Sequence, residues 1–132
     1  MTRKYAPSIA DIEALAYDAR MRLPPAFVEK ALEVGIRVEN MPSAGLLAEM
    51  EIVDPFELTA VYEGIPLTQK SVTDQPTAPD TVFLFRRPIL DEWASRGDVS
   101  LAELVAHIIV HEFAHHFGWS DDDIAAIDRW WE

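Results

Sequence analysis

The organising element of this chain is residues 100–121, which read SLAELVAHIIVHEFAHHFGWSD. Ser100, followed three residues later by Glu103, forms a capping box that predicts the start of a helix. Gly118 favours the left-handed backbone that ends helices, so the helix should run to about Phe117. Apolar side chains recur on nearly every side of this segment, which predicts a helix buried in the core of the domain.

Within this helix His111, Glu112 and His115 form the pattern H-E-x-x-H. Histidines four residues apart lie about 6 Å apart along the axis and about 40° around it, so both imidazoles can meet one zinc ion. Glu112 lies about 100° around the helix from His111, where it can reach a water beside the metal but cannot easily join the same ligand plane. His111 and His115 are therefore candidate metal ligands, and Glu112 is the candidate catalytic base.

The residues after the helix offer a third ligand, because the string continues as H-E-x-x-H-x-x-G-x-x-D. In an unbroken helix Asp121 would lie about 15 Å from His111, out of range. Since Gly118 ends the helix, the chain can fold back and bring Asp121 to the metal, which leaves the fourth position for water. Asp121 has a structural alternative too, since carboxylates in the first turn of a following helix favour its dipole. The other candidates for this ligand are Asp122, Asp128 and Glu132.

A purely structural interpretation of the motif is also open. Glu112 lies one turn before His116, and a buried pair of these two side chains would satisfy both groups without a metal. We expect His116 to point away from the ligand face and to serve in packing or in support of the ligands. His107, one turn before His111, could line the cleft, but we expect it to be a satisfied core histidine.

The composition limits the classes of function. The 132 residues suit one domain, residues 1–132, with a real hydrophobic core. Acidic residues outnumber basic ones by 23 to 11, and the net charge of -12 argues against nucleic acid and membrane surfaces as partners. Without cysteine, any metal site must use His, Asp or Glu. The longest apolar stretch is too short to span a bilayer, and we expect a cytoplasmic protein.

Outside the long helix, local signals predict helices around a small sheet. Helices are expected from Ser8, over residues 24–35, 42–50 and 88–97, and from Ser120 to the C-terminus. Strands are expected over residues 36–39, 58–62 and 81–85. Because the two kinds of element do not alternate strictly, the class is α+β, with a small mixed sheet packed against the buried helix and further helices at the N- and C-termini.

The string HEFAHHFG at residues 111–118, followed by Trp119, Ser120 and Asp121, resembles a family of small bacterial zincin-like metallopeptidases. Residues 61–68 (VYEGIPLT) and 85–89 (FRRPI) resemble the same family, and the likeness covers about residues 9–128. The resemblance implies a minimal zincin fold. It also implies zinc ligands at His111, His115 and Asp121, with Glu112 as the catalytic base.

We therefore expect a zinc-dependent metallopeptidase, a hydrolase that cleaves a peptide or protein substrate with Glu112 as general base. A substrate strand could add to a sheet edge formed by residues 81–85 or 58–62. The candidates for stabilising the oxyanion are Tyr62, Arg86 and Arg87. The alternative is a zincin-fold binding module that is catalytically idle or metal-poor, and the metal content of the purified protein would discriminate the two.

The floor of the site is a point of difference from the metzincins, which place a methionine turn beneath the metal. No methionine follows Asp121 in this chain. An apolar shell is still needed around a metal site, since it controls access of water. We expect the C-terminal helix to pack beneath the site, with Trp130 or Trp131 in place of the methionine.

Overall fold

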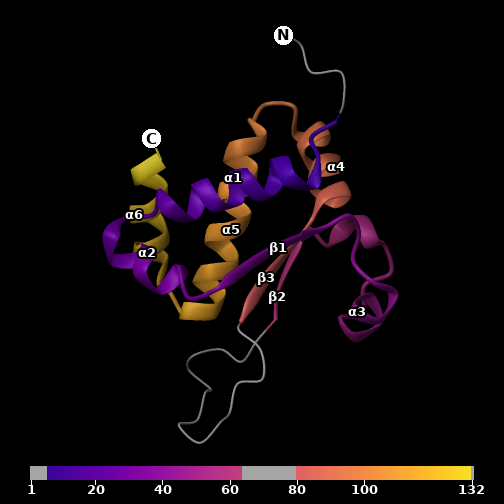
Figure 1. The fold of residues 1–132 in the computed structure, drawn as a ribbon, viewed down its shortest axis with the longest axis horizontal. Coiled ribbons are helices and arrows are strands. Elements are labelled where there is room, and N and C mark those ends of the chain that lie inside the picture. Colours follow the sequence, from indigo (N-terminus) through magenta and orange to yellow (C-terminus); the bar gives the residue numbers. More distant parts are fainter. Residues whose placement is uncertain (1–5, 64–79, 132) are drawn as a thin grey trace, which may run out of the picture.

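The chain forms helices on a three-stranded sheet, which confirms the expected α+β class. The computed structural model describes residues 6–63 and 80–131, with side chains described as far as residue 127. In chain order the elements are α1 (Ile9–Met21), α2 (Pro25–Ala31), β1 (Gly35–Glu39), α3 (Ala44–Glu49), the 3-10 turn η1 (Pro55–Glu57), β2 (Ala60–Glu63), β3 (Thr81–Phe85), α4 (Arg86–Arg96), α5 (Leu101–Phe117) and α6 (Asp121–Trp131). Figure 1 shows α5 through the middle of the molecule, with α1 crossing it.

The sheet has the strand order β1-β3-β2, with β1 parallel and β2 antiparallel to β3. The register places alternate residues of all three strands on one face, which is largely apolar and faces the core: Ile36, Val38, Ala60, Tyr62, Val82 and Leu84. β3 is the central strand, so residues 81–85 cannot offer the free edge that we expected for a substrate. In the described sheet the edge strands are β1 and β2.

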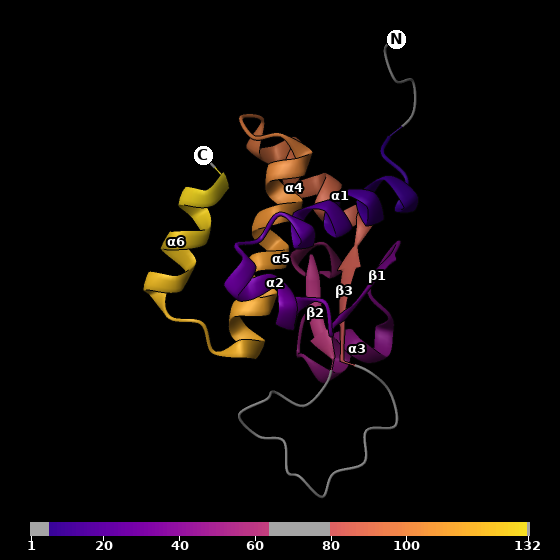
Figure 2. The same cartoon turned by 60° about the vertical axis from the view of Figure 1, so that its left-hand side comes forward.

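Helix α5 begins and ends where the sequence predicts. The Ser100 Oγ accepts a hydrogen bond from the Glu103 N–H at 3.1 Å, and Gly118 takes a left-handed backbone with φ 68°. The helix packs against α1, β2 and α4, and α1 in turn packs against β1 (Figure 2). The buried residues of α5 are Leu104, Val105, Ala106, Ile109, Val110, Phe113, Ala114 and His116.

In the described part of the structure, one side of α5 is left uncovered. His107, His111 and His115 recur every four residues along the helix, and all three side chains are exposed. The prediction of a helix buried on nearly all sides is therefore wrong for this stripe, which we call the histidine stripe. No helix in the described residues is long and apolar enough to cross a membrane.

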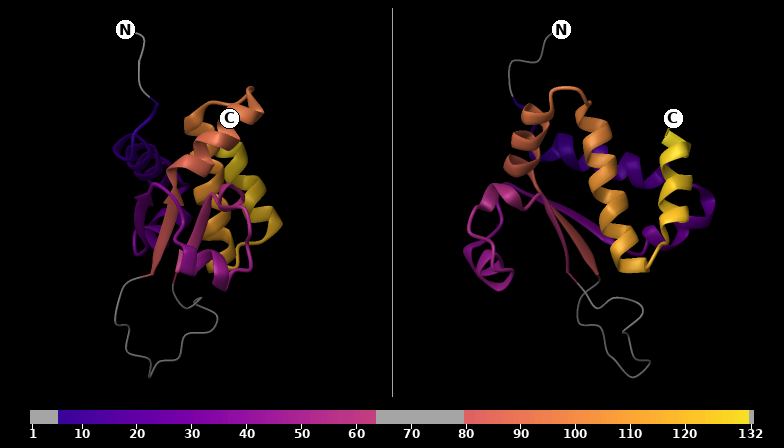
Figure 3. Two further views of the ribbon diagram at one scale, coloured as in Figure 1. Left: turned by 90° about the vertical axis from the view of Figure 1, so that its right-hand side faces the viewer. Right: turned by 180° about the vertical axis from the view of Figure 1, so that it is seen from behind.

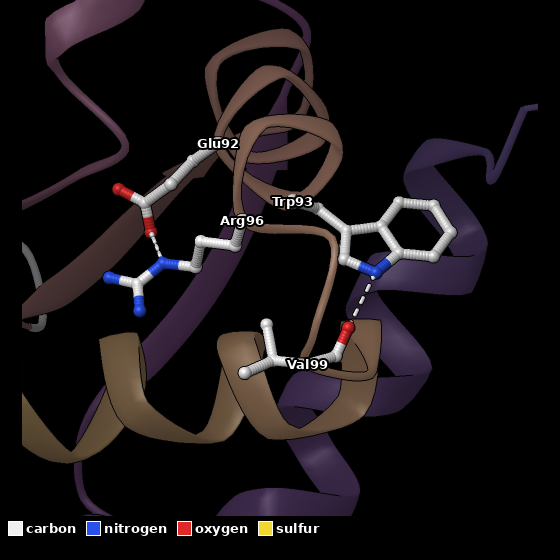
Figure 4. Close-up of polar contacts among 4 residues, drawn as sticks. All are labelled: Glu92, Trp93, Arg96 and Val99. Atoms are coloured by element: carbon white, nitrogen blue, oxygen red, sulfur yellow. Dashed lines mark hydrogen bonds and ion pairs between the residues drawn. The ribbon is translucent and has the colours of Figure 1, made fainter.

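The connection into α5 is held by α4. Gly97 ends α4 in a left-handed conformation with φ 72°. The indole N–H of Trp93 donates to the Val99 carbonyl at 3.0 Å, and the Arg96 Nε lies 3.3 Å from the Glu92 carboxylate (Figure 4). The Trp93 contact bridges the bend between the two helices, so the start of α5 has a defined position.

Two element boundaries differ from the sequence predictions. Helix α2 ends at Ala31, and Gly35 begins β1 because its N–H donates to the Asp80 carbonyl at 2.9 Å. Helix α4 begins at Arg86, two residues before Pro88. Proline is compatible with the first turn of a helix, where the backbone N–H has no intrahelical partner.

Replacing Gly118 by Ala should lower the free energy of unfolding by about 1 to 2 kcal/mol. An added Cβ would meet no atom within 4 Å, so the cost comes from the backbone angle alone. Gly45→Ala in α3 is the matched control, because its Cβ also meets nothing within 4 Å. There the substitution should be neutral or stabilise by up to about 1 kcal/mol. Urea unfolding measures both, and equal changes in the two variants would contradict the left-handed turn.

Candidate active site

His111 and His115 lie one turn apart on the histidine stripe of α5. The helix is regular through both residues, so the four-residue spacing places the two imidazoles on the same side. Both side chains are exposed and neither contributes to the hydrophobic core. The pair can therefore take up a ligand without disturbing the packing of the helix.

Glu112 is half-buried at the edge of this stripe. Burial raises the pKa of its carboxyl above the ordinary value, and the nearby His115 offsets part of the rise. Among the described residues no hydrogen bond or ion pair engages this carboxyl. A carboxyl that is partly shielded from water and has no structural contact of this kind is suited to proton transfer.

The carboxylate that faces His116 is Asp80, not Glu112. The His116 Nε2 lies 3.5 Å from the Asp80 Oδ2, and the imidazole stacks on Tyr62 with ring centroids 3.9 Å apart. The described structure thus lacks the Glu112–His116 pair that would explain the motif by packing alone. His116 is a buried packing residue, in line with the prediction.

His107 is exposed, and the prediction of a core histidine there is wrong. It lies four residues before His111 and so shares the uncovered side of α5. The two histidines that flank the motif therefore differ in burial. His107 is exposed to solvent, whereas His116 is buried in the core.

The turn after α5 is fixed by the backbone and by aromatic packing. The Trp119 N–H donates to the Ala114 carbonyl at 3.0 Å, which closes the end of the helix. The Trp119 ring stacks on Phe117 at 5.7 Å and meets Phe27 of α2 edge-on at 4.8 Å. Trp119 therefore sets the direction in which the chain leaves α5.

Helix α6 starts directly after this turn and runs back beside α5 (Figure 3). Ser120 and Asp123 form a capping box: the Ser120 Oγ accepts from the Asp123 N–H at 3.1 Å, and the Asp123 carboxylate accepts from the Ser120 N–H at 3.0 Å. Asp121 and Asp122 are exposed in the first turn, a position that favours negative charge.

The residues of the motif are only partly brought together. Within residues 6–63 and 80–127, no three His, Asp or Glu side chains are close enough to one another to hold one metal ion. The histidine pair fits the imidazole half of a zinc site, whereas the carboxylate of Asp121 is not part of such a group. The side chains of Asp128, Trp130, Trp131 and Glu132 lie outside the described part, so two of the alternative ligands and the expected floor of the site lie there.

The two arginines expected near the oxyanion are held elsewhere. The Arg86 Nε donates to the Pro7 carbonyl at 2.6 Å, and the Arg87 guanidinium lies over the Phe56 ring at 5.6 Å. Both residues follow the end of β3 that is remote from Asp80, about 20 Å along a strand that rises about 3.3 Å per residue. Neither arginine is placed to act beside the histidine pair.

Residues 31–131 match the family of zincin-like metallopeptidases, and the chain belongs to this family. The match runs from the end of α2 through α6 and includes the whole H-E-x-x-H-x-x-G-x-x-D string. No curated protein is significantly similar to the chain. Membership confirms the resemblance and the minimal zincin-like fold, and it indicates the class of hydrolases that usually use zinc.

Glu112→Gln should leave the free energy of unfolding of the metal-free protein unchanged or slightly higher. The reason is that burial opposes the charged carboxyl, and the nearby His115 offsets only part of this effect. Asp80→Asn is a matched acid-to-amide control and should cost about 1 to 3 kcal/mol, since Asp80 faces a buried imidazole. Chemical denaturation compares the two, and a loss at Glu112 as large as that at Asp80 would show that Glu112 is structural.

Proposed function

We propose that this protein is a zinc-dependent peptidase in which His111 and His115 hold the metal, Asp121 completes the ligand set and Glu112 is the general base. One observation carries the proposal. Helix α5 presents two outward imidazoles one turn apart, beside a half-buried carboxyl that no described side chain engages through a hydrogen bond or ion pair. A helix that served only in packing would need none of these three groups.

Zinc held there would act as a Lewis acid that polarises the scissile carbonyl group and lowers the pKa of water toward 7. Glu112 would accept the proton of the attacking water and deliver it to the leaving amine. Its partial burial supports this role, because a pKa above the ordinary value makes the carboxyl a better proton acceptor than an exposed glutamate.

The third ligand is assigned on the H-E-x-x-H-x-x-G-x-x-D spacing. Only Gly118, Trp119 and Ser120 separate α5 from α6, so Asp121 follows the last residue of α5 by four positions. Asp121 and Asp122 are both exposed there and take no part in the core. The spacing favours Asp121, and binding would require its carboxylate to approach the histidine pair.

The edge strand β2 suits an extended peptide substrate. It packs against α5, and among the described strands its outer edge has no neighbour. A peptide added to this edge would form main-chain hydrogen bonds with β2 and run next to the helix that carries the histidine pair. The acidic surface supports a peptide or protein partner rather than nucleic acid.

A second candidate function is a binding module that keeps the zincin fold without catalysis. The observation that favours it is the absence of a three-residue ligand group within the described residues. Such a module would bind zinc weakly or not at all and would act through protein contacts. Metal content and peptidase activity separate the two functions.

Elemental analysis after zinc addition and desalting should find one zinc per chain in the wild type. His111→Ala should lose it, because a single remaining imidazole cannot replace the pair. His107→Ala changes another exposed histidine of the same helix and should retain full zinc. Equal and sub-stoichiometric zinc in the wild type and in His111→Ala would contradict the metal site.

Glu112→Gln should retain zinc and lose peptide hydrolysis, with a decrease in kcat of about 10²- to 10⁴-fold. The amide keeps the size of the side chain but cannot accept the proton of water. Cleavage of a broad peptide library, followed by mass spectrometry, measures the effect. An active wild type whose Glu112→Gln variant cleaves equally fast would refute the mechanism, and a zinc-loaded but inactive wild type would favour the binding module.

A further inference from the structure

The last turn of α5 ends in a polar group of three side chains, the buried His116 and the partly buried Tyr62 and Asp80, which we call the buried cluster. His116 is only 2% exposed. Its ring lies on that of Tyr62 with centroids 3.9 Å apart and planes 15° apart, and its Nε2 is 3.5 Å from the Asp80 Oδ2. The stack orients the plane of the imidazole, and the carboxylate orients the ring within that plane.

The buried cluster connects α5 to the sheet. Tyr62 belongs to the edge strand β2, and Asp80 directly precedes the central strand β3. The main-chain carbonyl of Asp80 also accepts the N–H of Gly35, which begins β1. The end of α5 and the beginning of β3 lie at the same end of the molecule (Figures 1 and 2). The last turn of α5 is thus attached at the end of the sheet where β1 and β3 begin and β2 ends.

This attachment lies directly beside the proposed zinc ligands. His115 precedes His116, and consecutive residues of a helix are about 100° apart, so an inward His116 directs His115 outward. Glu112 lies one turn before His116 and about 40° from it around the helix, between His116 and the exposed histidine stripe. A rotation of this turn would therefore move His115 and Glu112 together.

Packing alone does not require polar groups at these positions. A buried imidazole and a partly buried carboxylate lose much of their hydration, and apolar side chains of similar volume would fill the space without that cost. A polar contact is directional, however, and can select one arrangement of the helix. Burial and the charge of Asp80 raise the pKa of Tyr62, so its hydroxyl stays protonated in this surrounding.

We infer that His116 is a positioning residue, which with Tyr62 and Asp80 sets the rotation of the last turn of α5 so that His115 and Glu112 face the zinc site. The inference rests on the proposed function, because it assigns a role relative to His111 and His115 as ligands. It extends that function, since none of the three cluster residues is a proposed ligand or proton carrier.

The test measures metal affinity and coordination in variants that keep the volume of the buried cluster. His116→Phe retains a ring against Tyr62 and removes the nitrogen that faces Asp80. It should bind Zn²⁺ about 10- to 100-fold more weakly than the wild type. The visible spectrum of bound Co²⁺, which reports ligand geometry, should change as well. His107→Phe is the matched control on the exposed side of α5 and should alter neither quantity.

A second variant is needed in case His116→Phe does not fold, because that substitution leaves the partly buried Asp80 carboxylate without its imidazole. Asp80→Asn keeps the shape of the cluster and should weaken Zn²⁺ binding in the same direction. Thermal unfolding of each metal-free protein identifies the variants that are folded at the assay temperature. Amide hydrogen exchange over residues 113–117 should be faster in both variants, a readout that needs neither metal nor activity.

The outcomes separate this inference from the proposed function. Weakening of tenfold or more in both folded variants, with His107→Phe at the wild-type value, would support the positioning role. Unchanged Zn²⁺ affinity and an unchanged Co²⁺ spectrum in both variants would overturn the inference and leave the proposed function intact. A wild type that binds Zn²⁺ no better than His111→Ala would overturn the proposed function and this inference with it.

Discussion

The burial of one side of α5 against α1 and the sheet is the constraint on which the rest of the structure depends. Ile109 and Phe113 have no exposed surface and lie in the core. A helix is rigid, so fixing these two side chains inward also fixes the direction of every other residue of α5. His111 and His115 are directed to solvent as a consequence. The same apolar contacts that stabilise the fold therefore orient the candidate metal ligands.

Much of the local structure could be predicted because the deciding contacts join residues close in sequence. The cap at Ser100 and the left-handed end at Gly118 are of this kind, and so is the capping box of α6. The strand order β1-β3-β2 could not be predicted, because it depends on pairing between distant segments. The role of Gly35 could not be predicted for the same reason. It begins a strand instead of ending a helix because its N–H donates to the carbonyl of Asp80, which is distant in sequence.

In the candidate site, too, the features that depend on local spacing could be predicted and those that depend on distant contacts could not. The i, i+4 spacing of His111 and His115 is a local property, and the structure keeps them on one side of α5. The exposure of His107 could not be predicted from the sequence of α5, since a helix rich in apolar residues does not define a single inner side. The contacts of His116 are made by Tyr62 in β2 and by Asp80, which directly precedes β3. In the sequence Asp80 is only a polar residue before an apolar strand, so its contact with His116 could not be predicted.

The central claim is that α5 presents one zinc site through its paired histidines. A crystal structure of the zinc-loaded protein, with anomalous diffraction recorded at the zinc absorption edge, locates the metal directly. We predict one peak per chain, about 2.0–2.1 Å from an imidazole nitrogen of both His111 and His115, with the Asp121 carboxylate about 2.0–2.2 Å away. A peak remote from this pair, or none in crystals grown with equimolar zinc, would contradict the claim.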